Sequence, residues 1–344
     1  MMNTGQVFQE LLSFASPSGS EHLIADYIKK IVRPYVDEIV EDARGNLLCY
    51  KYATTSMCNK TIAFVAHMDQ IGMMITFVED SGLIRFATIG AVDPQSIRGR
   101  LVQILHDNTI IYGVVGSMPV HMRKDCEKKD FDISELWIDI GTNSKEETIS
   151  KVNIGDYVAW YSPSLCLNDE IITGCSCDNK AGVTALIKAM ELISKTALNN
   201  NIVFVFSSQE EIGSKGISTA IKKITPDISI VVDVGHATDY PCVKKAKYGS
   251  IKVGGGCIIP FGLGINKEVQ SGILQMCINN NYLYQNLAMP DSSGTDANMI
   301  EKIGMECTIG MMLIPCRHMH SPVEMVSVRD IEIVGEICAS YCSL

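Results

Sequence analysis

Two segments near the N-terminus space their apolar residues as amphipathic helices do. In residues 6–15 and again in residues 20–36, apolar side chains recur every three or four positions, the period of one helix face. Residues 16–19 between them, Ser-Pro-Ser-Gly, have the composition of a turn. We therefore predict two helices joined by a turn. Their apolar positions are Val7, Leu11, Leu12, Phe14, Leu23, Ile24, Tyr27, Ile28 and Ile31.

Continuous apolar runs further along the chain indicate buried strands. Residues 61–65, 201–206 and 228–232 are short and rich in β-branched and aromatic side chains, a pattern typical of strands covered on both faces. Helical spacing returns in residues 180–198 and 328–342. Because strands and helices alternate, the pattern predicts a mostly open α/β sheet.

The stretch from residue 72 to residue 162 has a different pattern. Its strand-like runs are short and are separated by Gly, Asp-Asn and Gly-Asp turns, which predicts a β-rich insertion. We therefore expect residues 1–71 and 163–344 to form one discontinuous catalytic domain around an inserted domain at 72–162.

Composition and charge narrow the class of protein. The 344 residues suffice for two domains, and 47% hydrophobic with 20% charged residues is ordinary for a globular chain. A formal charge of −10 and the lack of a basic run argue against nucleic acid as a partner. No apolar run approaches the roughly 20 residues that cross a bilayer, and the start lacks a signal-peptide pattern, so we expect no membrane partner and a cytoplasmic location.

The cysteines do not form a recognisable framework. There are 13, an odd number, without a CxxC pair. A disulfide scaffold or a thiolate zinc site is therefore not expected, and we interpret them as reduced packing residues.

A histidine and an aspartate follow the first predicted strand. His67 and Asp69 are two positions apart, so they project to the same side of the strand's carboxyl end. A metal-binding imidazole usually donates its other N–H to a carboxylate, which would make Asp69 the support of His67. An isolated pair of this kind far more often lies on a solvated loop at a strand end, so the motif alone is weak evidence for a metal site.

Further acidic residues follow the other strands. Glu210 and Glu211 come after the second strand, and as neighbours they point in different directions, so one can bind a metal while the other takes a proton. Asp233 closes the third strand, and Asp178 precedes the helix that begins near residue 180. Each could also be an ordinary helix-end charge or cap. His320 follows a later apolar run at 307–314.

The ordered motifs together resemble one known family. HMDQIG, CDNKAG, SSQEEIG, VVDVGHATDYP, SSGTDA and RHMHSPVE follow one another as in the tetrahedral (TET) aminopeptidases, deblocking and glutamyl aminopeptidases that have also been described as endoglucanases. GVVGSMPVHM and IDIGTNSKEE extend the resemblance into the insertion. As an ordered set that spans the chain, they are far more specific than any single motif.

The resemblance implies a fold, an activity and an assembly. The fold would be an α/β/α sandwich with a mixed sheet, interrupted by a β-rich, barrel-like domain. The activity would be removal of N-terminal residues from peptides by two divalent metal ions. Subunits would pair through the insertion, and six dimers would form a hollow twelve-subunit particle that admits peptides.

The resemblance also implies a role for each site residue. Asp178 would bridge both ions, with His67 and Asp233 completing one position and Glu211 and His320 the other. Glu210 would be the general base and Asp69 the support, and the peptide bond after Asp178 is expected to be cis. Nitrogen and oxygen donors without thiolate suit zinc, cobalt or manganese. His121, His236 and His318 are expected to be structural.

Two residues depart from the family pattern. Gln70 stands where a Glu is usual, and Lys180 stands where an Arg is common. Neither is an expected ligand or base, so we expect them to affect substrate preference or local packing. The preferred N-terminal residue stays open, because the loops around residues 254–264 and 288–296 would shape that pocket.

Three alternative functions share parts of this pattern. A dinuclear deacylase or carboxypeptidase of the same superfamily would use similar ligands, and only the insertion, GTDA and RHMHSPVE favour the aminopeptidase. A metal-free scaffold is disfavoured by the complete set of ligands and base. A glycosidase would need two separated carboxylates, which the adjacent Glu210 and Glu211 do not provide.

Overall fold

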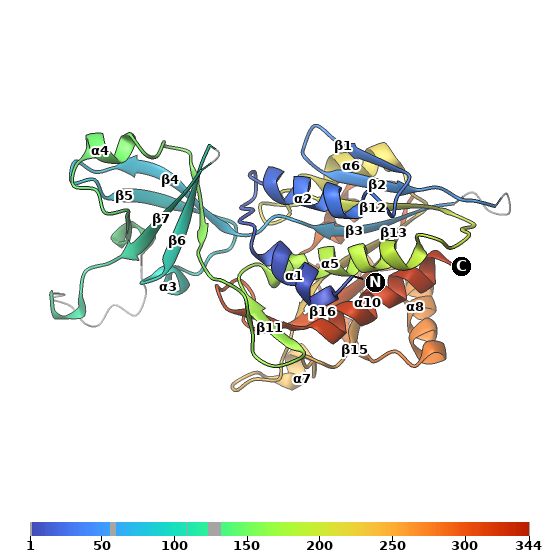
Figure 1. Cartoon of the computed structure of the whole chain (residues 1–344). Coiled ribbons are helices and arrows are strands. Elements are labelled where there is room, and N and C mark those ends of the chain that lie inside the picture. The colour runs from blue at the N-terminus through green and yellow to red at the C-terminus, as the bar shows by residue number, and fades with distance from the viewer. Residues whose placement is uncertain (1, 56–59, 108, 123–131, 344) are drawn as a thin grey trace.

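A mixed sheet of eight strands forms the larger part of the molecule (Figure 1). The computed structural model describes residues 2–55, 60–107, 109–122 and 132–343. The four central strands run parallel, and the next strand on each side of them runs antiparallel. In spatial order the strands are β1 (Glu38–Glu41), β2 (Leu47–Lys51), β12 (Asn201–Ser207), β3 (Thr61–His67), β13 (Ile228–His236), β16 (Thr308–Cys316), β14 (Cys257–Gly262) and β15 (Tyr284–Met289).

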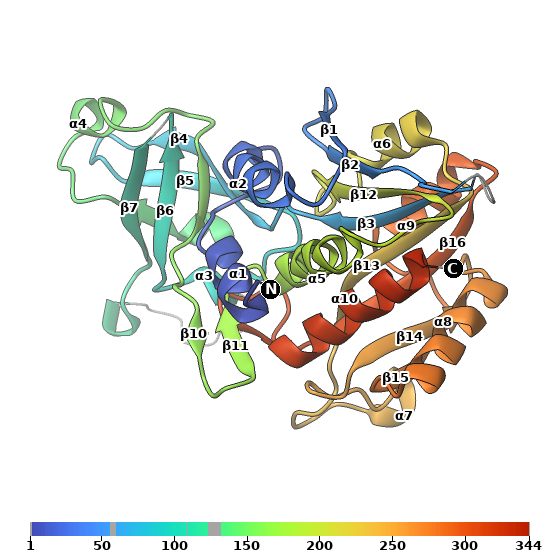
Figure 2. The ribbon, with the colours of Figure 1, turned by 45° about the vertical axis from the view of Figure 1, so that its right-hand side comes forward.

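Helices cover both faces of this sheet. On β3, Ile62 and Phe64 pack into the hydrophobic core on one face and Val65 into the core on the other, as alternation along a strand requires. The helices of the first face are α1 (Thr4–Leu12), α2 (His22–Val32), α5 (Cys177–Ile193), α8 (Lys267–Asn280) and α10 (Val328–Cys342). Those of the second are α6 (Ile217–Ile224) and α9 (Asp296–Ile303) (Figure 2).

A closed barrel lies beside the sheet, between β3 and α5 in the chain. Its inward side chains form a separate apolar core that includes Met73, Ile104 and Trp160. Its strands are β4 (Gly72–Val78), β5 (Ile84–Ile89), β8 (Trp137–Asp139), β7 (Thr109–Gly116), β6 (Leu101–His106) and β9 (Tyr157–Trp160). Short helical turns complete it: α3 (Pro94–Ile97), η1 (Val120–Met122), η2 (Ile133–Glu135) and α4 (Lys145–Ile149).

The architecture confirms the predicted fold class, an α/β/α sandwich with a mixed sheet and a barrel-like part. The division into domains at residues 72 and 162 stays a prediction. A small sheet of β10 (Leu165–Cys166), β11 (Ile171–Gly174) and β17 (Glu324–Ser327) and the short α7 (Lys245–Tyr248) complete the elements. No helix among the described residues is long and apolar enough to span a bilayer.

One stretch predicted as loop contains a strand. Residues 254–264 include β14, which lies between β15 and β16. Its glycines and Pro260 hide the strand pattern, because proline cannot donate to a ladder and is unusual inside a sheet. Here Gln270 takes the place of the missing donor, since its amide donates to the carbonyl of Met311 on the adjacent β16 at 3.0 Å.

The described cysteines are free. Eight of the eleven are buried and behave as packing residues. Cys58 and Cys126 lie outside the described residues.

Candidate metal centre

The strands deliver polar side chains to one edge of the sheet. His67 is the last residue of β3, and Ser207, its partner on the parallel β12, directly precedes the segment that carries Glu210 and Glu211. Asp233 lies near the carboxyl end of β13, the parallel neighbour on the other side. Carboxyl ends of parallel strands are where open α/β sheets bind ligands.

Three of the predicted residues form a first group. The Nε2 atom of His67 lies 3.1 Å from Oδ1 of Asp178 and 3.5 Å from Oδ1 of Asp233. One donor atom of each residue lies within 4.8 Å of the others, close enough to surround one ion. All three residues are buried.

A second group shares Asp178 with the first. The Nε2 atom of His320 lies 3.4 Å from Oδ2 of Asp178 and 3.5 Å from Oε2 of Glu211. Asp178 therefore presents one oxygen to each group, as a bridging ligand would. The five predicted ligands are thus brought together in two overlapping trios.

The first turn of α5 aims the shared aspartate. Asp178 and Asn179 have non-helical backbone angles, and regular helix follows from Lys180. The Asn179 side chain donates to the carbonyl of Val232 on β13 and accepts from the N–H of Gly182. The Asp178–Asn179 peptide bond is cis, which confirms that prediction.

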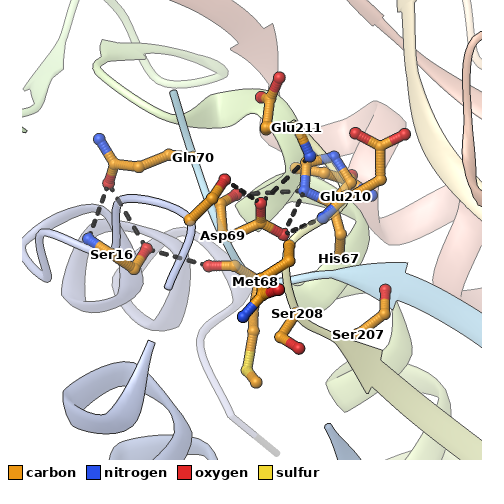
Figure 3. Close-up of polar contacts among 12 residues, drawn as sticks. Ser16, His67, Met68, Asp69, Gln70, Ser207, Ser208, Glu210 and Glu211 are labelled. Atoms are coloured by element: carbon orange, nitrogen blue, oxygen red, sulfur yellow. Dashed lines mark hydrogen bonds and ion pairs between the residues drawn. The ribbon is translucent and has the colours of Figure 1, made fainter. Parts of the chain in front are cut away.

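Asp69 contacts both His67 and the glutamate pair (Figure 3). Its carboxylate is 3.5 Å from Nδ1 of His67, but its backbone carbonyl is closer, at 3.1 Å. The two carboxylate oxygens accept the N–H groups of Glu210 and Glu211 at 3.0 and 3.2 Å and the Ser18 hydroxyl. Asp69 therefore fixes the backbone of the glutamate segment, and its carbonyl is the part of the residue nearest to the imidazole.

Burial and crowding of like charges shift the pKa values of the site. Burial raises the pKa of Glu210 to about 9, with repulsion from Asp296, Asp233 and Asp69 adding to it. Burial, followed by the neighbouring Asp178, also raises the pKa of Glu211 well above its ordinary range. A cation bound nearby would act in the opposite direction and lower the pKa of both carboxyl groups.

The imidazoles carry the complementary shifts. Burial alone would lower the pKa of His67, but Asp233, Asp178 and Asp69 raise it well above its ordinary value. The pKa of Asp178 is lowered. Burial alone would raise it, but the hydrogen bonds from His320 and His67 outweigh burial.

The donor set fits divalent ions. Oε1 of Glu211 is buried and has no hydrogen-bond partner, an arrangement that costs free energy unless something else binds the atom. No lysine or arginine among the described residues forms an ion pair with these carboxylates. Nitrogen and oxygen donors in overlapping trios are what a pair of divalent ions requires.

Sequence reasoning missed two acidic neighbours of the site. Glu324 accepts the backbone N–H groups of Asp178 and His320. It is the last residue of the RHMHSPVE motif, and this position was the sequence signal that could have identified it. Asp296, in the SSGTDA motif, is buried and accepts from the Ser207 hydroxyl. Burial raises the pKa of Asp296 to about 7.

The remaining histidines lie outside both groups. His318 faces the ring of Tyr240, with centroids 6.1 Å apart, and His121 and His236 do not belong to either trio.

The two departures from the family pattern contact each other. Nζ of Lys180 donates to Oε1 of Gln70 at 3.0 Å and also to the carbonyl of Phe14. Both side chains are buried. Their proximity supports an effect on local packing.

Comparison with known proteins shows what the chain is similar to. The family model of the M42 glutamyl aminopeptidases matches residues 45–337. The lysyl aminopeptidase of Pyrococcus furiosus is 27% identical over 334 residues, which cover 95% of this chain and 93% of that protein.

The chain is also similar to solved structures of aminopeptidases. Aminopeptidase APDkam598 of Desulfurococcus kamchatkensis has a TM-score of 0.92 and 28% identity, with 99% of this chain and 95% of that one covered. The TET1 peptidase of Pyrococcus horikoshii, which can assemble into a tetrahedron or a large octahedral shell, has a TM-score of 0.88 and 25% identity, with 99% of both chains covered.

Proposed function

Since this chain belongs to the M42 glutamyl aminopeptidase family, we propose that it releases N-terminal residues from peptides by means of two divalent metal ions. The observation that carries this proposal is the sharing of Asp178. Its Oδ1 lies near His67 and its Oδ2 near His320, so a single carboxylate serves two trios of donors. One carboxylate between two ions is the arrangement that two-metal hydrolysis needs.

Each proposed ligand belongs to one trio or to both. His67 and Asp233 would hold one ion with Asp178, and Glu211 and His320 the other. When bound, the ions would polarise the scissile carbonyl and lower the pKa of water. The donor types suit zinc, cobalt or manganese.

Glu210 is the proposed general base. It lies next to a proposed ligand, and Asp69 holds its backbone N–H. From there its carboxylate would take a proton from the attacking water and pass it to the leaving amine. Asp69 would also orient His67 through the Nδ1 side of the ring.

The test combines metal analysis with a substrate panel. Protein purified without chelator should contain about two ions per subunit, the number that a two-metal mechanism uses. It should cleave anilides of unblocked amino acids, lose activity with a chelator, and regain it with added zinc, cobalt or manganese. Cleavage of N-acyl amino acids alone would favour the deacylase alternative. A metal-free protein without activity would favour the scaffold.

We also propose a homo-oligomer in which dimers form through the barrel and assemble into a dodecamer. Support comes from the TET1 neighbour, whose shells are assemblies, and from the outer face of the barrel. Leu101, Ile110, Tyr112 and Val114 are exposed on β6 and β7, and the pairing of Leu101 with Val114 places them on one face. A hollow particle would admit peptides and exclude folded proteins. A cytoplasmic location stays part of this proposal.

A further inference from the structure

Glu324 connects the backbones of two proposed ligands. It is the first residue of β17, and only 2% of its surface is exposed. Oε2 accepts the N–H of Asp178 at 3.0 Å, and Oε1 accepts the N–H of His320 at 2.8 Å. These two ligands come from α5 and from the segment after β16, which are more than 140 residues apart in the chain.

The carboxylate is held by these donors without a cationic side chain. Among the described residues, no lysine or arginine forms an ion pair with Glu324. A buried carboxyl group is costly unless its oxygens are satisfied, so both N–H groups matter for its stability. Its place between the two backbones indicates a role in fixing their relative position.

The backbone of His320 needs such a contact. His320 has φ of +60°, in the left-handed region that residues with a Cβ seldom adopt. The bond from its N–H to Glu324 holds the main chain in this conformation, and the Ala91 carbonyl lies 3.1 Å from Nδ1 of its ring. Together these contacts direct Nε2 toward Asp178 and Glu211.

We propose that Glu324 is a positioning residue that forms the second metal position by holding Asp178 and His320 at a fixed separation. This inference rests on the proposed function. Both residues that Glu324 binds belong to the trio of Asp178, Glu211 and His320, whereas only Asp178 belongs to the trio with His67 and Asp233. Loss of Glu324 should therefore weaken the second position more than the first.

Replacement of Glu324 by glutamine separates this role from simple space filling. Glutamine has nearly the same shape but offers only one acceptor oxygen, so its amide nitrogen must face one of the two N–H groups. One ligand backbone is then displaced. Changes of this kind behind metal ligands typically weaken metal binding by about 10–100-fold.

Asp330 offers a matched control in the same chain. It too is a buried carboxylate that accepts two backbone N–H groups, those of Gly254 and Gly256, each at 2.7 Å. It belongs to neither trio. Asp330→Asn therefore imposes the same chemical change on a loop outside the proposed centre.

The experiment measures metal content and metal affinity of the full-length protein, Glu324→Gln and Asp330→Asn. We expect wild type and Asp330→Asn to retain two ions and Glu324→Gln to retain about one. In calorimetric titration with zinc, the second position of Glu324→Gln should bind about 10-fold or more weakly than that of wild type. Excess metal should restore most of kcat in Glu324→Gln. Glu324→Asp, which cannot reach both N–H groups, should show the same direction of change if the glutamine variant does not fold.

Two results would overturn the inference. One is Glu324→Gln with two ions at wild-type affinity, and the other is an equal loss of metal in Asp330→Asn, which would indicate general destabilisation. A wild-type protein that binds no metal would instead contradict the proposed function itself.

Discussion

Individual carboxylates in this centre contact more than one partner. Asp178 directs its two oxygens to different trios, and Asp69 divides its oxygens between His67 and the N–H groups of Glu210 and Glu211. Removal of any one side chain therefore disturbs several neighbours. Variants that retain size and shape are the informative ones.

Glu210→Gln should abolish turnover and leave metal content unchanged. A glutamine cannot take a proton from water, so we expect kcat to fall by about 100-fold or more, while the bound ions remain because Glu210 belongs to neither trio. Turnover of an aminoacyl anilide and metal analysis of the same sample measure both effects. Glu211→Ala and His320→Ala are the counterparts, each expected to empty one position first. Loss of an ion in Glu210→Gln would exchange the roles of the two glutamates.

Gln70→Glu should stabilise the protein by pairing the buried Lys180. Burial lowers the pKa of Lys180 to about 8 from 10.5, so its buried charge destabilises the fold at pH 7. Ser16 and Lys180 already donate to Gln70, and a carboxylate accepts from both. We expect Tm at pH 7 to rise by about 1–2 °C, the effect of about 1 kcal/mol in a chain of 344 residues with an unfolding entropy of about 2 cal/mol/K per residue.

The same pair should also change how the stability of the protein depends on pH. Because the folded pKa of Lys180 lies below its unfolded value, wild-type stability should increase as pH rises from about 8 to 10.5 and this charge is lost. Thermal melts of both proteins across that range should show a flatter dependence in Gln70→Glu. Gln70→Met serves as the control and should lower Tm, since it leaves Lys180 with fewer acceptors. A lower Tm in Gln70→Glu would contradict the pairing argument.

At the level of secondary structure, the first turns of α5 depend on the close approach of the Asn179 side chain to Gly182. A Cβ on Gly182 would lie 2.3 Å from Oδ1 of Asn179, the atom that accepts the Gly182 N–H. Asn179 cannot easily move aside, because its amide also binds the Val232 carbonyl. The packing of this turn and the aim of Asp178 are therefore linked.

Gly182→Ala should impair metal binding although alanine favours helices. We expect displacement of Asn179 and Asp178 to weaken metal affinity by about 10-fold or more, as for other supporting changes near ligands. Gly272→Ala on α8 is the matched control, since a Cβ there meets no atom within 4 Å. It should stabilise the protein by up to about 1 kcal/mol with metal content unchanged. Equal metal affinity in the two variants would show that the close approach is relieved without moving Asp178.

In the molecule as a whole, the exposed barrel face is the proposed contact between subunits. Tyr112 is 57% exposed and packs edge-on against Tyr161 at a centroid distance of 4.9 Å. Leu101, which pairs with Val114 on the same face, is 53% exposed. Exposed aromatic and aliphatic side chains grouped on one sheet face are typical of protein–protein contacts.

Tyr112→Glu should dissociate the proposed dimer. A charge in the middle of an apolar contact is desolvated without a partner, so we expect the mass measured by light scattering to fall below that of the wild-type assembly. Leu263→Glu, at a residue that is 73% exposed and outside the barrel, should keep the dimer. An unchanged mass in Tyr112→Glu, or a monomeric wild type, would remove the barrel face from the assembly.

The local pattern of apolar residues in the sequence was sufficient to predict the strands and helices that position the metal centre. Apolar periodicity predicted β3, β12, β13, α5 and α10, and the structure has each of them, because period and burial are linked in a strand or helix. The sequence also indicated which His, Asp and Glu residues could form the site, because these polar residues directly follow the apolar runs of the strands. The motif order supplied the family.

Tertiary structure alone decided which groups meet. The sharing of Asp178 between two trios depends on α5, β3 and the segment after β16 arriving at one point, and no local pattern encodes that meeting. Strand β14 went unpredicted because its proline breaks the strand pattern, and the donor that replaces the missing N–H, the Gln270 amide on α8, reaches the Met311 carbonyl only in the fold. Glu324 was missed because a buried carboxylate acquires its role from the backbone N–H groups that the fold brings to it. His320 is close in the sequence, but the second donor, Asp178, lies 146 residues away.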